Sequence, residues 1–400
     1  LMYIADKGNN RIVITDLELN LVREMSEFNY NGEILTLNKP LGVYVDKYTS
    51  FIYICDSEND RVIKCDTDGN VDMLFTRPTN EIYSSDVTFN PNKVCVDKAG
   101  NVYIVVKSIT RGAVMYDKEG EFLGFFGANT VQQTSEVLYN AFWNLFRTDD
   151  QKARSKKVTP VGFTNFDIDD EGFIYTVTDS QTTTQDLLKK LNPRGDNILD
   201  SLGIGSEFTF GDRPPTYYSI YAKQSSLTDI DIGPNGELNI LDFEHGRIFQ
   251  YDKECWLLFI MGGIGEQLGT FRSATAIESY DDKLFVLDSR KNNITIFSRT
   301  VFGEIVTNAA NLYNDGYYEE SLVPWQNVLK YDGNYRRAYT GIGNALYNQY
   351  KYKEAMEYFK IGKNQGRYGR AFEGYRDQWL KKNFTAILVV LAVIIIAIVV

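Results

Sequence analysis

Apolar and polar residues alternate along roughly the first three hundred residues, in short runs separated by polar turns. The clearest case runs from Tyr53 to Asp66, where Asp56 ends one run and Arg61 begins the next. A period of two on both sides of a tight turn is typical of a half-buried antiparallel hairpin. The pattern recurs, so a repeated β unit organises this part of the chain. Related stretches lie at 4–16, 104–111, 240–252 and 286–293.

Additional turns rich in Gly, Asp and Asn flank each hairpin, for example at 66–70, 97–101 and 169–173. Two outer turns around a central hairpin predict four antiparallel strands per unit, and such units of about 40–50 residues are propeller blades. We expect the fourth unit to be degenerate and the first to lack its innermost strand, so that the sequence is a segment of a longer protein. The six predicted units are 1–27, 39–77, 89–128, 161–202, 227–262 and 273–306.

The motif Asp-x-x-Asn-x-Arg-[Ile/Val], seen as Asp6 to Ile12 and Asp56 to Val62, resembles the NHL repeat. The resemblance implies a mainly β fold, a six-bladed NHL-type β-propeller over residues 1–306. Within it, residues 129–160 form an insertion with an apolar stripe at helical spacing. The insertion either covers a ligand site or docks a partner, or it simply packs on the blades.

Asp and Arg recur at fixed positions on either side of the hairpin turns, where they face each other. Such pairs stabilise a hairpin by about 0.2–1 kcal/mol. A ring of these side chains on one face could instead contact a carbohydrate ligand. We prefer the structural interpretation and keep the ligand ring as the alternative. The residues are Asp6, Arg11, Asp56, Arg61, Asp242 and Arg247.

After residue 306 the period changes from two to 3.6. The segments starting at Gly316 and Tyr350 match with a displacement of 34 residues, and this resembles the tetratricopeptide repeat (TPR). We expect two TPR-like repeats over 307–365, followed by a juxtamembrane helix over 366–383. We also expect few constraints at the junction near Val306, so that the repeats form a separate spacer. Their predicted core residues are Tyr318, Trp325, Tyr352 and Phe359.

Residues 384–400 contain one polar side chain, Thr385, which predicts a transmembrane helix cut at its far end. Seven basic residues between Lys360 and Lys382 favour a cytoplasmic location for the part of the chain before the membrane helix. However, long folded domains can cross membranes regardless of such charges. The order of propeller, TPR pair and membrane helix resembles exported proteins of Gram-positive-type bacteria that end in a Yip-family domain. These are often encoded beside carbohydrate transporters. The resemblance implies the plasma membrane, with the propeller on the extracytoplasmic face.

Charge and composition narrow the function classes. The net charge is −11, and 12 Lys and Arg against 9 Asp and Glu between 304 and 383 leave −14 for the propeller. Such an acidic surface does not favour phosphate backbones, so we expect no nucleic-acid partner and keep an RNA-binding NHL domain only as the less favoured alternative. His245 is the only histidine, which disfavours zinc sites and Ser-His-Asp triads. We therefore predict no catalytic, cofactor or metal residues.

The four cysteines, Cys55, Cys65, Cys95 and Cys255, lie in or beside predicted strands without a metal-binding spacing. We interpret them as buried free thiols, with a Cys55–Cys65 neighbour pair as the alternative.

We predict a membrane-anchored, non-catalytic binding or scaffold protein that is accessory to carbohydrate uptake or sensing. Its partners would be proteins, a carbohydrate or a transporter complex, and the lipid bilayer through 384–400. The alternative is a metal-dependent sugar-lactone hydrolase similar to gluconolactonases, with carboxylates and Asn around a divalent ion on the propeller axis.

Overall fold

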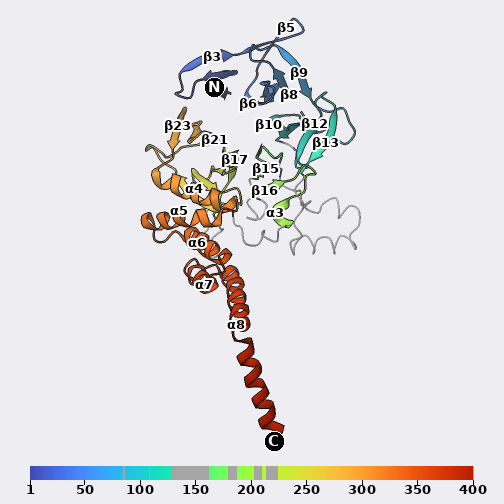
Figure 1. The fold of residues 1–400 in the computed structure, drawn as a ribbon. Coiled ribbons are helices and arrows are strands. Elements are labelled where there is room, and N and C mark those ends of the chain that lie inside the picture. Colours follow the sequence, from blue (N-terminus) through green and yellow to red (C-terminus); the bar gives the residue numbers. More distant parts are fainter. Residues whose placement is uncertain are drawn as a thin grey trace, which may run out of the picture.

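The computed structural model describes residues 1–83, 86–107, 109–127, 162–178, 187–201, 210–212 and 224–399. This part of the chain is mainly β and ends in five helices, the last of which extends away from the sheets (Figure 1). The predicted insertion at 129–160 and most of the loop at 203–226 lie outside the described residues.

The strands form seven antiparallel sheets within the described ranges: three of four strands, three of three strands and one hairpin. The four-stranded sheets are β6 to β9 (Pro40–Val45, Ile52–Asp56, Arg61–Cys65, Val71–Thr76), β10 to β13 (Pro91–Val96, Val102–Val106, Ala113–Tyr116, Phe122–Phe126) and β17 to β20 (Leu227–Ile232, Leu238–Asp242, Arg247–Tyr251, Leu257–Gly262). The three-stranded sheets are β1 to β3 (Met2–Asp6, Arg11–Thr15, Leu21–Met25), β14 to β16 (Asn165–Ile168, Ile174–Val177, Leu188–Leu191) and β21 to β23 (Ala274–Tyr280, Lys283–Asp288, Asn293–Ser298). The hairpin pairs β4 (Glu27–Tyr30) with β5 (Glu33–Thr36), and a short helix α3 (Ile198–Ser201) follows β16.

Successive sheets pack through the first strand of each, which we call the first strands: β1, β6, β10, β14, β17 and β21. Each first strand lies against the next one along the chain. Within every sheet the strands follow in sequence order. The sheets therefore succeed one another in a β-propeller-like arrangement (Figure 1).

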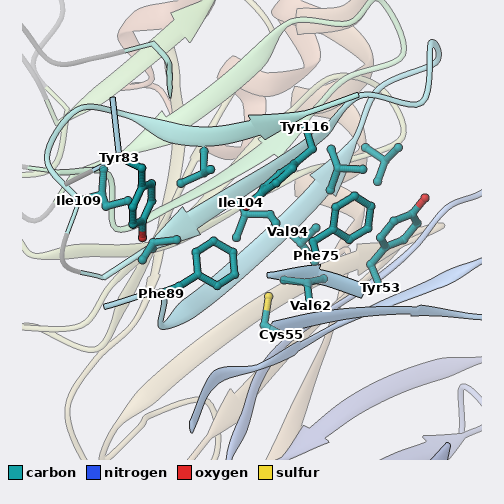
Figure 2. Close-up of a cluster of buried hydrophobic side chains, with 14 residues drawn as sticks. Tyr53, Cys55, Val62, Phe75, Tyr83, Phe89, Val94, Ile104, Ile109 and Tyr116 are labelled. Carbon is teal, nitrogen blue, oxygen red and sulfur yellow. The ribbon is translucent and has the colours of Figure 1, made fainter. Parts of the chain in front are cut away.

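The hydrophobic core is divided among the gaps between neighbouring sheets. One cluster joins the sheet of β6 to β9 with the sheet of β10 to β13 (Figure 2). Tyr53 and Phe75 come from the first sheet, and Ile104 and Tyr116 from the second. The Phe75 and Tyr116 rings meet edge to face with centroids 5.4 Å apart. Alternate residues of a strand serve opposite clusters, as the period of two requires.

The last sheet ends earlier than the sequence suggests. We expected an outer strand near residues 302–306, but helix α4 (Val301–Asn314) occupies this segment. The Thr300 side chain caps the helix by accepting a hydrogen bond from the Gly303 N–H at 3.1 Å, a typical helix start. The expected boundary at Val306 is thus wrong, because the buried residues from Val306 to Tyr313 recur at helical spacing.

Five helices complete the described chain, and neighbouring pairs pack on one another from α4 to α8. After α4 they are α5 (Tyr318–Tyr331), α6 (Arg336–Asn348), α7 (Tyr352–Ile361) and α8 (Gln365–Val399). The expected juxtamembrane helix and membrane helix are a single continuous helix, α8, which extends away from the rest (Figure 1).

The helices are docked on the sheet of β17 to β20 rather than held apart from it. Leu258 of β20 belongs to the same buried cluster as Val306, Trp325 and Phe359 of the helices. The Tyr335 hydroxyl donates a hydrogen bond to the Leu258 carbonyl at 3.0 Å. This contact surface, which we call the docking junction, replaces the loosely constrained spacer that we expected.

Candidate functional site

Five charged side chains gather on four adjacent first strands, and we call them the first-strand cluster. They are Lys93 of β10, Asp167 of β14, Asp229 and Asp231 of β17, and Glu278 of β21. Asp229 and Asp231 are each 2% exposed, whereas Glu278 remains open to solvent. Four carboxyl groups therefore lie near a single ammonium group.

The carboxylates of this cluster connect neighbouring sheets. Asp167 accepts a hydrogen bond from the Ile232 N–H of β17 at 2.9 Å. Asp229 accepts one from the Ile277 N–H of β21 at 2.8 Å. The same relation joins Asp231 to the Ser279 N–H at 3.0 Å. Backbone groups at these packed edges would otherwise lack partners, so each carboxylate has a structural role.

The four carboxyl groups of the first-strand cluster have raised pKa values. Burial and then repulsion by Asp231 raise the pKa of Asp167 to about 7. Burial also raises the pKa of Asp229 and Asp231. The pKa of Glu278 lies well above its ordinary value. Desolvation is the first cause and repulsion by Asp231 is the second, although the side chain retains contact with water. Such shifts are frequent at functional sites and also occur in structural networks.

Lys93 is the only cation of the first-strand cluster. Its Nζ lies 3.6 Å from the Asp229 Oδ1, and Asn165 donates a hydrogen bond to the same carboxylate oxygen. Burial lowers the pKa of Lys93, but the attraction of Asp229 and the other carboxylates outweighs it and raises the pKa. The lysine therefore stays charged and neutralises part of the excess negative charge of the cluster.

The polar network continues one strand further into the sheet. Asn239 of β18 donates a hydrogen bond to Asp231 at 2.7 Å and accepts one from the Gln250 amide at 2.7 Å. Among the described residues, no group of three or more His, Cys, Asp or Glu side chains is placed to hold a metal ion.

None of the site residues predicted from the sequence belongs to the first-strand cluster. Its signal was available: acidic and apolar residues alternate at Phe166-Asp167-Ile168 and at Asp229-Ile230-Asp231-Ile232. On a strand, this pattern places the carboxylates on one face and the apolar side chains on the other. In β17 both faces are covered, so its acidic face marks a buried polar network.

The predicted Asp–Arg pairs form at all three hairpins. The distances are 2.8 Å for Asp6–Arg11, 2.8 Å for Asp56–Arg61 and 3.3 Å for Asp242–Arg247. Asp56 and Asp242 are fully buried, and each also accepts a backbone N–H from the loop before the first strand of its sheet. Asp56 and Asp242 therefore tie their hairpin tips to their sheets, and the ligand ring stays an untested alternative.

All four cysteines are buried and free, which confirms the preferred interpretation. Cys55 belongs to the cluster shared with β10 to β13, whereas Cys65 belongs to the cluster on the other face. The two thiols point to opposite faces of their sheet because they occupy opposite phases of the strand alternation. The alternative that they are neighbours is wrong.

The predicted helical core residues divide into two classes. Trp325 and Phe359 are buried at 0% and 1% exposure, so both are core residues as predicted. Tyr318 and Tyr352 are half-buried and pack on the rings of Tyr313 and Tyr347.

Close approach of the helices explains why two glycines lie in α6. A Cβ at Gly341 would collide with the Trp325 ring, and a Cβ at Gly343 would collide with the Phe359 ring. Both aromatic side chains therefore pack directly on the α6 backbone.

Within the described chain, one helix is long and apolar enough to cross a membrane, the segment Gln365–Ile398 of α8. Its most apolar stretch is not buried against the protein. At the other end of α8, Ala371 is buried in the cluster that includes Leu258 and Trp325. The same helix thus joins the docked helices to the apolar end.

No family model matches the chain, and no curated protein sequence does. Among solved structures, virginiamycin B lyase from Staphylococcus aureus is similar at 10% identity and a TM-score of 0.37, over 66% of this chain and 71% of that one. Kuenenia stuttgartiensis hydrazine synthase is similar at 10% identity and a TM-score of 0.43, over 75% and 92%. A Bacteroides thetaiotaomicron protein of unknown function is similar at 11% identity and a TM-score of 0.44, over 74% and 66%.

Proposed function

We propose that this chain is a membrane-anchored, non-catalytic binding protein whose propeller presents a ligand site while α8 spans the bilayer. The observation that carries the proposal is the shared core of β20, α4 to α7 and the start of α8. A single packed unit connects the sheets to the apolar helix. Such a connection holds a binding domain at a fixed place above a membrane.

We further propose six blades of NHL type and two TPR-like repeats. Six sheets with adjoining first strands and three hairpins with the Asp–Arg pair support the first assignment. The equivalent burial of Trp325 and Phe359, 34 positions apart, supports the second. An experimental structure of the full chain tests both, and a different number of blades would refute the first.

The proposed ligand of the first-strand cluster is a carbohydrate, bound as part of uptake or sensing. Carboxylates accept hydrogen bonds from sugar hydroxyls, and a lysine ammonium donates to them. The cluster offers both kinds of group, and Lys93 and Glu278 are accessible to solvent. Protein partners, including a transporter complex, would contact the outside of the same unit.

Binding is tested with the full chain in a neutral detergent, by calorimetry against a panel of neutral and amino sugars. We expect one class to bind, and Lys93→Met to weaken it at least fivefold. Lys283→Met, at the start of β22 and outside the first-strand cluster, should leave binding unchanged. No binding across the panel would refute the carbohydrate assignment.

Anchoring is tested by comparing the full chain with a chain shortened before Phe384. The full chain should sediment with the plasma membrane and resist alkaline extraction, and the shortened chain should not. Protease added to intact cells should cleave the propeller if it lies on the extracytoplasmic face. Protection from the protease would reverse the proposed orientation.

A further inference from the structure

The sheet of β21 to β23 departs from the hairpin pattern of the other copies. Asp288 and Asn293 are paired in register across this hairpin, in the positions that Asp56 and Arg61 occupy in an earlier one. Asn therefore replaces the arginine that elsewhere neutralises the buried aspartate. The aspartate of the pair is kept as Asp288, so the change from the repeat pattern is confined to its partner, Asn293.

Asp288 compensates through the backbone. Its carboxylate is fully buried and accepts the N–H groups of Arg272 at 2.7 Å, Ser273 at 3.1 Å, Arg290 at 3.0 Å and Lys291 at 3.0 Å. These bonds fix the hairpin tip without using any cationic side chain. The charged ends of Arg290 and Lys291 are thereby left to other partners.

Two of the corresponding tips are acidic, and the tip after Asp6 carries a single cation, Lys7. The tip after Asp56 holds Glu58 and Asp60, and the tip after Asp242 holds Glu244. The tip after Asp288 instead holds Arg290 and Lys291, on a chain with a net charge of −11. Two cations at this one tip oppose the overall sign of the protein.

The loop at 263–271 faces the tip, and the two border an open hollow of about 470 Å³ that we call the cationic hollow. The loop is held by a hydrogen bond from the Phe271 N–H to the Gly263 carbonyl at 2.8 Å, and the Phe271 side chain is fully buried. Lys291 donates to the Thr270 carbonyl at 2.9 Å and so fastens the tip to the loop. The volume falls in the range of small-ligand sites, about 300–1,000 Å³.

The lining combines positive charge with groups that bind hydroxyls. Arg272, Arg290 and Lys291 are opposed by one carboxylate, Glu266, which pairs with Arg272. In the part of the chain that the structure describes, Arg290 has no ion pair. The side chains of Asn293 and Thr295 also line the hollow, and none of the described residues is hydrogen-bonded to them.

We propose that the cationic hollow binds a small anion that also carries hydroxyl groups, either a sugar phosphate or a sugar acid. Arg290 and Lys291 hold the oxyanion, through the charge-assisted hydrogen bonds that guanidinium and ammonium groups make to phosphate and carboxylate. Asn293 and Thr295 contact the hydroxyls. This site is separate from the first-strand cluster and does not depend on the ligand proposed there.

The test uses calorimetry of the full chain in neutral detergent with four probes: glucose 6-phosphate, glucuronate, inorganic phosphate and glucose. We expect glucose 6-phosphate, glucuronate or both to bind, which identifies the oxyanion, while glucose does not bind. Arg290→Gln combined with Lys291→Gln should weaken binding at least tenfold. The bonds to Asp288 come from backbone N–H groups, so the hairpin tip should keep its fold in the double variant, which loses only the bond from Lys291 to the Thr270 carbonyl.

The control is Lys283→Gln, at the opposite end of β22, which should change affinity less than twofold. Thr295→Val should weaken binding of the sugar-bearing probe and leave inorganic phosphate unaffected. An absence of binding by both anionic sugars, or equal losses in the double variant and the control, would overturn the proposal. Equal affinity for inorganic phosphate and glucose 6-phosphate would overturn its hydroxyl component.

Discussion

Two regions of this protein bury charge, and they do so in opposite ways. At the docking junction, Arg337 and Asp252 form one matched pair at 2.7 Å, with side-chain exposures of 10% and 1%. The Arg337 guanidinium also lies over the rings of Trp256, at 4.9 Å, and Tyr313, at 5.1 Å. In the first-strand cluster, four carboxyl groups share the single cation Lys93.

The contrast separates a structural contact from a candidate binding site. A matched pair with aromatic neighbours is complete and needs nothing from solution, although burying it contributes little net stability. An excess of carboxylates stays costly until protons, or a ligand that donates hydrogen bonds, reduce it. Stability at the junction should therefore depend on keeping the pair, whereas stability at the cluster should depend on pH.

The largest expected effect is at the docking junction. Arg337→Met leaves the Asp252 carboxylate buried without its cation, which should cost about 3–5 kcal/mol in the free energy of unfolding. Chemical denaturation of the full chain in detergent measures the loss. Arg336→Met, the adjacent exposed arginine, is the matched control and should change stability by less than about 0.5 kcal/mol. Equal effects of both variants would mean that the pair does not hold the junction.

An intermediate effect is expected at the first-strand cluster. The folded-state pKa of Asp167, about 7, lies above the value of about 3.9 for an unfolded chain. The stability contributed by its protonated form is therefore complete below about pH 4 and is lost as pH rises through 7. Asp167→Asn should keep the hydrogen bond from the Ile232 N–H and remove this loss.

The free energy of unfolding of Asp167→Asn, taken relative to that of the wild type, should be about 1–3 kcal/mol higher at pH 8 than at pH 5. Denaturation curves at the two pH values measure the difference. Asp231, Glu278 and Lys93 face the same space, so the remaining pH dependence of the variant reports on them. A variant with the same offset at both pH values would show that Asp167 does not titrate in this range.

The smallest effect concerns the hairpin pairs. Arg61 is 17% exposed and binds a fully buried Asp56, whereas Arg11 and Asp6 are 32% and 24% exposed. We expect Arg61→Ala to cost about 1–2 kcal/mol and Arg11→Ala less than about 1 kcal/mol, because exposed pairs are weak. Thermal unfolding of both variants gives the ranking. The reverse order would indicate that exposure does not control these pairs.

Much of the fold could be predicted from local pattern. The alternation and the turn residues located the hairpins, and the Asp–Arg pairing followed from residues that face each other across one turn. Cys65 shows the limit of the same reasoning. Two residues on paired strands are neighbours only if their phases agree, and the register places Cys65 opposite Ile52 rather than near Cys55.

Contacts between distant segments could not be predicted in this way. Asp167 and Ile232 are joined across two sheets, and Arg337 meets Asp252 from another part of the chain. The short β-branched and aromatic run at the start of α4 also matched a strand as well as a helix, until the cap at Thr300 decided it. Pattern alone does not encode which surfaces meet.

The central claim is that the helices and the sheets form one rigid unit, and melting of Trp325→Ala tests it most directly. Trp325 is buried in the cluster that reaches Leu258 of β20, so its loss weakens the docking junction from the helical side. Circular dichroism follows the helices and the sheets of the full chain in one experiment. We predict a single transition in which both signals shift together to lower temperature. A helical signal that melts early while the sheet transition keeps its wild-type midpoint would contradict the claim and restore a separate helical spacer.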